Sequence, residues 1–238
     1  MADIIPAILS NNYEDLKNNL SLVRHIVPIV QIDICDGIFT PHMTWPFLKK
    51  PKGDVNEFEL DYHFQKILNE QEGMPFWEDL EFELDLMVQD AMENFDIYTK
   101  MGPRRIVFHL EALKSLEDFK EFLEGVDPFI KESVDIGIAF GTNIDLEKVY
   151  TFGNVVDFFQ VMGIKKIGFQ GEPFNEECLD YVKALKEKFP DVPVSVDGSV
   201  NFDTANDLLS VGADRLVIGS AIFNTNDIIN TIEEFKNL

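Results

Sequence analysis

Two polar residues interrupt an aliphatic stretch in the segment QIDICDG, which occupies positions 31–37. Successive side chains of an extended strand point to opposite faces, so Gln31 and Asp33 share one face and the aliphatic residues between them share the other. Polar side chains are costly inside an apolar strand unless they are bonded or do chemistry. We therefore interpret Gln31 and Asp33 as candidate functional residues on the inner face of a strand that ends at Asp36-Gly37.

Two Gly-Ser turns near the end of the chain have the composition of an anion site. VDGSV at 196–200 and VIGSAIF at 217–223 each place glycine and serine just before a helical pattern. Glycine lets backbone N–H groups approach an anion closely, and a helix N-terminus favours negative charge. Such a site needs no Lys or Arg, and neither turn contains one. Each glycine alone could simply shape a turn, but the pair predicts a phosphate site.

Eight apolar runs of strand length alternate with segments of helical periodicity. These runs predict strands at 3–9, 28–34, 81–87, 105–109, 135–140, 156–162, 192–197 and 214–219. Helical spacing follows Asn12, a candidate cap, then Asp90, and then a capping-box pattern at Ser115. It also covers 178–189, 201–212 and 226–235. Strand–helix alternation indicates a parallel sheet, and eight units predict a closed (β/α)8 barrel. A doubly wound open sheet is the rival, although AILSNN after the first strand lacks the glycine-rich turn typical of it.

Active sites of such barrels lie at the C-terminal ends of the strands. The side chains expected at these ends are Ser10, Gln31, Asp33, Asp85, Met87, His109, Glu111, Met162, Asp197, Gly198, Ser199, Gly219 and Ser220.

The bulk properties limit the classes of partner. The formal charge is −23, which argues against nucleic acid, because binding its phosphates needs a basic surface. Neither a signal peptide nor an apolar run long enough for a membrane span is recognisable. Two cysteines without metal-type spacing favour a reducing, cytoplasmic setting. We expect one domain over 1–238, with an extended crossover at about 47–81 that contains a short helix near 61–70 and could serve as a lid or as the contact of a homo-oligomer.

Seven stretches, in order along the chain, carry a more specific pattern. In the first half, PAILS (6–10) is similar to P-S-I-L-S, QIDICDGIFTPHMT (31–44) to H-x-D-x-M-D-G-x-F-V-P-N-x-T, LDLMV (84–88) to V-H-L-M-V, and FHLEA (108–112) to v-H-x-E-a. In the second half, VMGIKKIGFQGEPF (161–174) is similar to v-M-t-V-n-P-G-F-G-G-Q-x-F with one extra residue, VDGSV (196–200) to V-D-G-G-I, and GADRLVIGSAIF (212–223) to G-A-d-x-x-V-x-G-S-a-I-F. This pattern resembles that of the ribulose-phosphate 3-epimerase family of phosphate-binding (β/α)8 barrels.

The resemblance implies roles for individual residues. Asp33 and Asp197 would form an acid/base pair, in which one carboxylate removes the C3 proton of a sugar phosphate and the other returns a proton on the opposite face. Met87 and Met162 would pack around the enediolate. The remaining contacts to the substrate and its phosphate would come from Ser10, Gly168, Gly171, Gly198, Ser199, Gly219 and Ser220.

The chain departs from the family pattern at the metal ligands. The family holds a divalent metal with two histidines and two aspartates, and the histidine positions fall here on Gln31 and Asp85. With Asp33 and Asp197 these form an all-oxygen set, which favours magnesium or manganese over zinc or iron. Without a cation, three close carboxylates require that at least one be protonated. A site that has lost its metal, with Gln31 bonded to a neighbour, is the alternative that stays open.

The function implied by the resemblance is 3-epimerisation of a ketose phosphate, with D-ribulose 5-phosphate and D-xylulose 5-phosphate as the pair. A hexulose 6-phosphate is the nearest alternative substrate. A non-catalytic sugar-phosphate-binding barrel with a decayed metal site is the alternative of a different class, which retention of both acid/base aspartates disfavours and loss of both histidines favours.

Overall fold

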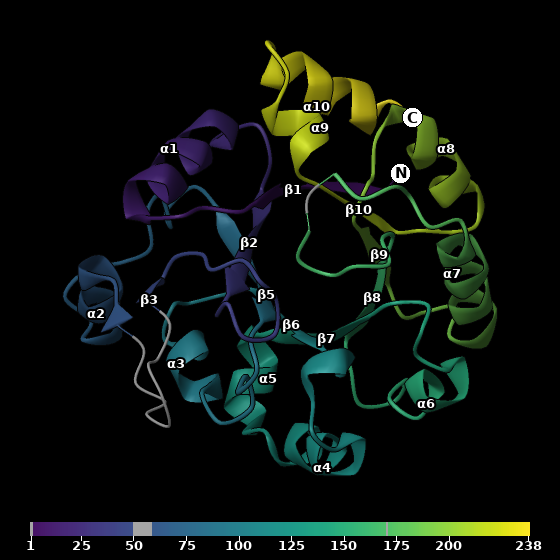
Figure 1. The fold of residues 1–238 in the computed structure, drawn as a ribbon, viewed down its shortest axis with the longest axis horizontal. Helices are drawn as coiled ribbons and strands as arrows, with labels where there is room; N and C mark the ends of the chain where they lie inside the picture. The colour runs from purple at the N-terminus through teal and green to yellow at the C-terminus, as the bar shows by residue number, and fades with distance from the viewer. Residues whose placement is uncertain (1, 50–58, 170) are drawn as a thin grey trace.

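The computed structural model describes residues 2–49, 59–169 and 171–238. Its main sheet is a closed, fully parallel barrel in the order β1-β10-β9-β8-β7-β6-β5-β2, with the helices outside it (Figure 1). The strands are β1 Asp3–Ile8, β2 Ile29–Cys35, β5 Glu81–Met87, β6 Arg105–His109, β7 Asp135–Phe140, β8 Phe158–Met162, β9 Val194–Asp197 and β10 Arg215–Ile218. The predicted (β/α)8 barrel is confirmed, and both ends of each predicted strand lie within two residues of the ends of the observed strand.

The helices are α1 Tyr13–Val23, α2 Tyr62–Leu68, α3 Phe95–Thr99, α4 Leu116–Gly125, α5 Pro128–Ser133, α6 Leu146–Tyr150, α7 Glu177–Lys188, α8 Phe202–Ser210, α9 Ser220–Phe223 and α10 Ile228–Lys236, with a short 3-10 helix η1 at Leu110–Ala112. The predicted caps Asn12 and Ser115 each accept a hydrogen bond from a backbone N–H of the first turn, and so does Asn201, where another helix was predicted to begin. The helix expected directly after Asp90 starts later, because turns extend to Asn94 and α3 begins only at Phe95.

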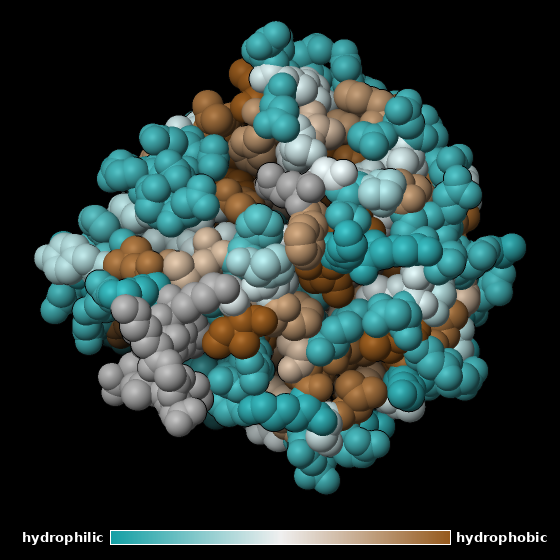
Figure 2. All heavy atoms as spheres, viewed as in Figure 1, coloured by the Kyte–Doolittle hydropathy of each residue, from teal (hydrophilic) through white to brown (hydrophobic). Residues whose placement is uncertain are grey.

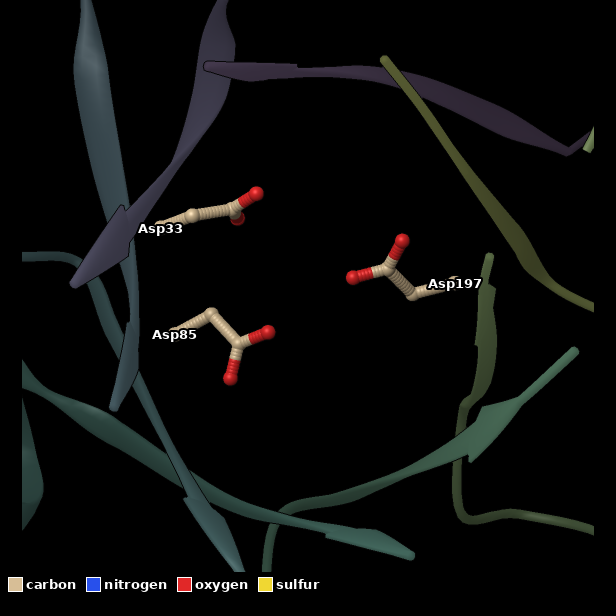
Figure 3. Close-up of side chains that lie close together, drawn as sticks. All are labelled: Asp33, Asp85 and Asp197. Carbon is tan, nitrogen blue, oxygen red and sulfur yellow. The ribbon is translucent and has the colours of Figure 1, made fainter. Parts of the chain in front are cut away.

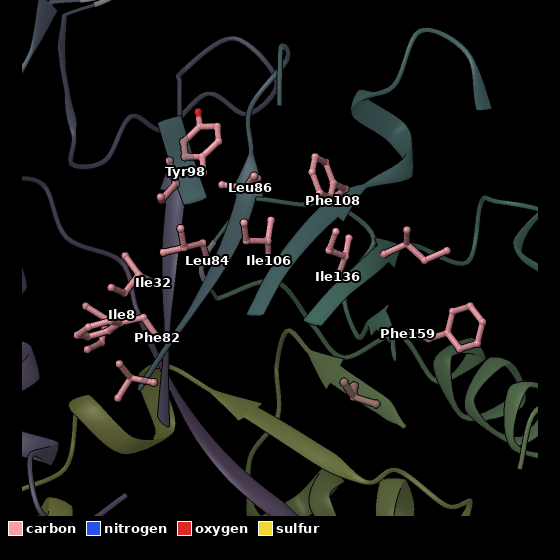
Figure 4. Close-up of a cluster of buried hydrophobic side chains, with 14 of the residues drawn as sticks. Ile8, Ile32, Phe82, Leu84, Leu86, Tyr98, Ile106, Phe108, Ile136 and Phe159 are labelled. Carbon is pink, nitrogen blue, oxygen red and sulfur yellow. The ribbon is translucent and has the colours of Figure 1, made fainter. Parts of the chain in front are cut away.

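The main hydrophobic core lies between the outer face of the barrel and its helices. Ile32 and Ile34 of β2 belong to it, whereas Gln31 and Asp33 face the barrel interior, as the alternation predicts. Figure 4 shows aliphatic and aromatic side chains of neighbouring strands in this layer, among them Ile32. The apolar layer fixes which face of each strand turns outward, and therefore which side chains must turn inward.

The crossover between β2 and β5 contains more than the predicted helix. β3 (Phe47–Lys49) and β4 (Glu59–Leu60) form a small antiparallel pair, and α2 follows. His63 of α2 stacks on Tyr13 of α1, with ring centroids 3.8 Å apart. The part of the predicted crossover at 50–58 lies outside the described residues, and its service as a lid or subunit contact stays a prediction, as does the single domain over 1–238.

The surface carries most of the charge. Hydrophilic residues are spread around the face seen in Figure 2, with smaller hydrophobic groups between them. Across the described parts of the chain, no helix has both the length and the apolar character needed to cross a bilayer.

Candidate active site

Three carboxylates converge inside the barrel. Asp33 of β2 and Asp85 of β5 are paired in the parallel register, which places them side by side. Asp197, the last residue of β9, approaches from the opposite side of the barrel (Figure 3). One carboxylate oxygen of each lies within 4.8 Å of those of the other two. The fold therefore brings together three acidic residues that were predicted at separate strand ends.

The amide of Gln31 joins these carboxylates. Its Nε2 donates to Asp33 Oδ1 over 2.8 Å and to Asp197 Oδ2 over 2.9 Å, and it lies 3.5 Å from Asp85 Oδ2. The Oε1 of Gln31 is buried and has no hydrogen-bond partner among the described residues. As placed, Gln31 is a hydrogen-bond donor to the acidic cluster, which is the alternative to metal ligation that the sequence leaves open.

Two further side chains complete the cluster. His109, at the end of β6, places Nε2 2.6 Å from Asp85 Oδ1. Gln160 of β8 directs Nε2 at Asp85 Oδ2 and Asp197 Oδ2, at 3.4 and 3.5 Å. His109 was expected at the end of its strand, but Gln160 was missed. The sequence offered one indication of its position: Gln160 is two residues before Met162, and residues two apart on a strand share a face.

Burial and mutual repulsion change the proton affinities of this cluster. Burial raises the pKa of Asp33 well above its ordinary value, and the carboxylates of Asp197 and Asp85 raise it further. Burial, followed by the charge of Asp85, raises the pKa of Asp197 to about 7. Burial lowers the pKa of His109, but the hydrogen bond to Asp85 and the charges of Asp85, Glu111 and Asp197 together raise it, so it lies above the usual value. A cluster with such values contains both an acid and a base near neutral pH.

The donor chemistry of the cluster also bears on metal binding. Asp33, Asp85 and Asp197 lie close enough together that they could hold a divalent cation. Carboxylate oxygens are suitable ligands for one. Gln31 would have to present Oε1 in place of Nε2 to join them, so the fit is good for the three aspartates and incomplete for the amide.

A cavity of about 330 Å³ opens beside the acidic cluster at the C-terminal ends of the strands. Asp33 and Asp197 line its inner end. The cavity also contains most of the residues for which a substrate contact was predicted: Met87, Met162, Gly168, Gly171, Gly198, Ser199, Gly219 and Ser220. These residues come from four widely separated parts of the sequence, which the barrel assembles.

Ser10 lies elsewhere. Ala7 and Leu9 line the cavity, whereas Ser10 is buried beside α1 and its Oγ accepts a hydrogen bond from Asn19 Nδ2 over 3.4 Å. Ser10 has the same parity as Ile8, which packs in the outer core. The structure therefore does not bring Ser10 to the cavity with the other predicted residues.

The turn after β9 has an unusual backbone. Gly198 and Ser199 have φ values of 105° and 54°, both in the left-handed region. The hydroxyl of Ser199 donates to the carbonyl of Glu172, which ties this turn to the loop between β8 and α7. Glu172 itself lines the cavity, and its Oε1 lies 3.5 Å from Lys166 Nζ. This acidic side chain was not among the residues predicted from the sequence.

The fold and the site together define a (β/α)8 barrel with an acidic centre at the C-terminal ends of its strands. A model of the ribulose-phosphate 3-epimerase family matches residues 3–223, and the chain belongs to that family. It is 23% identical to a ribulose-phosphate 3-epimerase of Schizosaccharomyces pombe, covering 99% of this chain and 93% of the relative. It is 24% identical to that of Bacillus subtilis, covering 99% of both chains.

Solved structures show the same fold at low sequence identity. KGPDC from Streptococcus mutans matches with a TM-score of 0.69 at 14% identity, covering 99% of this chain and 96% of the other. A 3-hexulose-6-phosphate synthase matches with a TM-score of 0.63 at 16% identity, covering 99% and 98%. At these identities the likeness extends to the barrel alone.

Proposed function

We propose that this protein is an isomerase, a ketose-phosphate 3-epimerase that interconverts D-ribulose 5-phosphate and D-xylulose 5-phosphate. Family membership and relatives named ribulose-phosphate 3-epimerase support this reaction. The observation that carries the proposal is the placement of Asp33 and Asp197 on opposite sides of the barrel interior, both lining one cavity. Inverting a carbon requires a group on each face of the substrate, and this arrangement supplies one from each side.

The proposed chemistry moves two protons. One aspartate, in its ionised form, takes the proton from C3, and the electrons of the broken C–H bond pass into an enediolate. The other aspartate, in its protonated form, gives a proton to C3 on the opposite face. The raised pKa values of Asp33 and Asp197 support this division, because they allow one carboxyl to be protonated while the other is ionised. The hydrogen bonds from Gln31 keep both carboxylates oriented toward the cavity.

The phosphate of the substrate is assigned to the other side of the cavity. The turns at Gly198–Ser199 and Gly219–Ser220 both line it and have no basic side chain of their own. Backbone N–H groups in such turns bind anions without a formal charge. Met87 and Met162 supply the apolar surface between the phosphate end and the acidic end.

A cation at the three aspartates would neutralise charge on the enediolate and on the carboxylates, and its oxygen ligands would favour magnesium or manganese over zinc or iron. We further propose that the protein works in the cytoplasm on this small molecule; one relative, from Oryza sativa, is named as a cytoplasmic isoform.

The test is an epimerase assay of the wild type and of Asp33→Asn and Asp197→Asn. Each variant removes one acid/base group, and we expect turnover to fall about 10²- to 10⁴-fold. Asp214→Asn is the matched control, because Asp214 bonds Val194 N and Lys186 and does not line the cavity. Wild-type protein that binds the pentulose phosphate without turnover would show a binding barrel, and full turnover in Asp33→Asn would refute the two-carboxylate mechanism.

A further inference from the structure

We propose that Gln160 is a positioning residue which, with Gln31, holds the acidic centre together by amide hydrogen bonds, so that the centre keeps its geometry without a divalent cation. This inference rests on the proposed epimerase function for its kinetic consequence. It deepens that function by assigning the task of bridging the three carboxylates to neutral side chains of the chain itself.

The first observation is the reach of the Gln31 amide. A single nitrogen atom bonds Asp33 and Asp197 at 2.8 and 2.9 Å and approaches Asp85 at 3.5 Å. An amide nitrogen carries two hydrogens, so it can satisfy two acceptors well. Gln31 therefore links β2 to β9 across the barrel, and it leaves Asp85 with only a weak contact.

The second observation is that Gln160 and His109 contact the carboxylate of Asp85, which Gln31 contacts only weakly. His109 Nε2 lies 2.6 Å from Oδ1 of Asp85, and Gln160 Nε2 lies 3.4 Å from Oδ2 of the same residue. The same Gln160 nitrogen lies 3.5 Å from Asp197 Oδ2. Gln160 thus gives Asp85 and Asp197 contacts about as long as that of Gln31 to Asp85, and the two amides together link all three carboxylates.

The third observation is the burial of the donors. Gln31, Gln160 and His109 are each at most 1% exposed, so water does not compete for their hydrogen bonds. Hydrogen bonds to a charged acceptor are strong in such surroundings, and losing one leaves a buried carboxylate uncompensated. Two neutral amides therefore bridge the three carboxylates and partly offset their repulsion, as a bound cation would, but without a formal charge.

The wild-type protein gives a test that needs neither substrate nor a variant. We expect purified protein to contain a divalent metal at well below one equivalent. We also expect its melting temperature to be unchanged by a chelator and by added Mn²⁺. Stoichiometric metal, or a melting temperature that falls on chelation, would overturn the proposal. Because no turnover is measured, this result stands whether or not the proposed epimerase function is correct.

Gln160→Met tests the positioning role, because methionine is also unbranched and has no donor. We expect the variant to lose about 10- to 100-fold in kcat with KM changed little, since misplaced catalytic groups cost rate more than binding. We also expect Mn²⁺ to raise its melting temperature, because the carboxylates then lack a donor that offsets their repulsion. Ser195→Ala is the matched control: Ser195 is buried on β9 opposite Gln160 in the register, and its Oγ has no partner among the described residues.

The control should keep both wild-type kcat and indifference to Mn²⁺. Equal loss of kcat in Ser195→Ala and Gln160→Met would show a general packing effect and overturn the role of Gln160. Full kcat in Gln160→Met would also overturn it. If Gln160→Met fails to fold, the measurements on the wild type still decide whether the centre requires a cation.

Discussion

Glu172 is a residue whose charge opposes the proposed ligand. Its side chain lines the cavity near Ser199, where a dianionic phosphate is expected, and Lys166 lies 3.5 Å away as its ion-pair partner. We expect Glu172→Gln to lower the KM of the sugar phosphate about fivefold, because a repulsive charge is removed at a partly solvated site. We expect Lys166→Gln to raise KM by a similar factor, since Glu172 is then unpaired.

Lys165 offers a close control for this pair. It neighbours Lys166 and is as exposed, but it pairs with Glu177 at 3.7 Å, outside the cavity. Lys165→Gln should leave KM unchanged in the same initial-rate assay. Identical KM values for the Lys165 and Lys166 variants would contradict a local effect on phosphate binding.

At the scale of single residues, the sequence predicts some of the site and misses part of it. Gln31 and Asp33 were recognisable because two polar residues alternate with aliphatic ones, and burial makes that alternation meaningful. Gln160 is the only polar residue in FFQVM, so it shows no periodicity of its own. Its partners are on β5 and β9, and no local pattern predicts contacts across a barrel.

At the scale of elements, the loop between β8 and α7 depends on two glycines with positive φ. Gly168 has φ +79°, and a Cβ there would lie 2.5 Å from Thr40 Cβ, so this loop packs tightly on the segment after β2. Gly171 has φ +75°, but a Cβ there would meet no described atom within 4 Å. A side chain at either position would strain the left-handed backbone, but only at position 168 would it also clash with a neighbouring residue.

We expect Gly168→Ala to reduce kcat/KM by about tenfold or more, because the loop must move away from Thr40 and so shift the part of the cavity that it lines. Gly171→Ala should suffer only the left-handed backbone penalty of about 1–2 kcal/mol. Initial rates and thermal melts of both variants separate the two effects. Equal loss of kcat/KM in the two variants would show that backbone strain, and not the contact with Thr40, controls the loop.

The strands were easier to predict from the sequence than the short helices. Each strand of the barrel is an apolar run bounded by polar residues, and burial on both faces makes such runs conspicuous. The helices α5 and α6 were not predicted, because each has only five or six residues and too few turns for a periodic stripe. Asp127 followed by Pro128 was a usable start signal for α5, since Asp127 accepts a hydrogen bond from Phe129 N.

At the scale of the whole molecule, the charge of −23 opposes the approach of any phosphorylated substrate. We expect kcat/KM for the pentulose phosphate to rise several-fold as ionic strength increases. The Debye length falls to about 10 Å at 0.1 M salt, so the repulsion between the acidic protein and the phosphate is screened. Stopped-time initial rates over a salt series give the measurement. Inhibition by inorganic phosphate, measured in parallel, should strengthen in the same direction, and a steady fall of kcat/KM with salt would contradict the expectation.

The closure of the barrel by its first and last strands has a consequence for how the molecule folds. β1 pairs with β10, so Asp3 lies beside Arg215, and Pro6, which has no N–H to donate, lies beside Ile218. Contacts between residues so far apart in sequence form late, because the chain must first close a very long loop. Until then β1 has an unpaired edge, which is a surface for association with other unfolded chains. Hydrogen exchange should therefore show β1 and β10 gaining protection after β5, β6 and β7 during refolding, and refolding yield should fall as protein concentration rises.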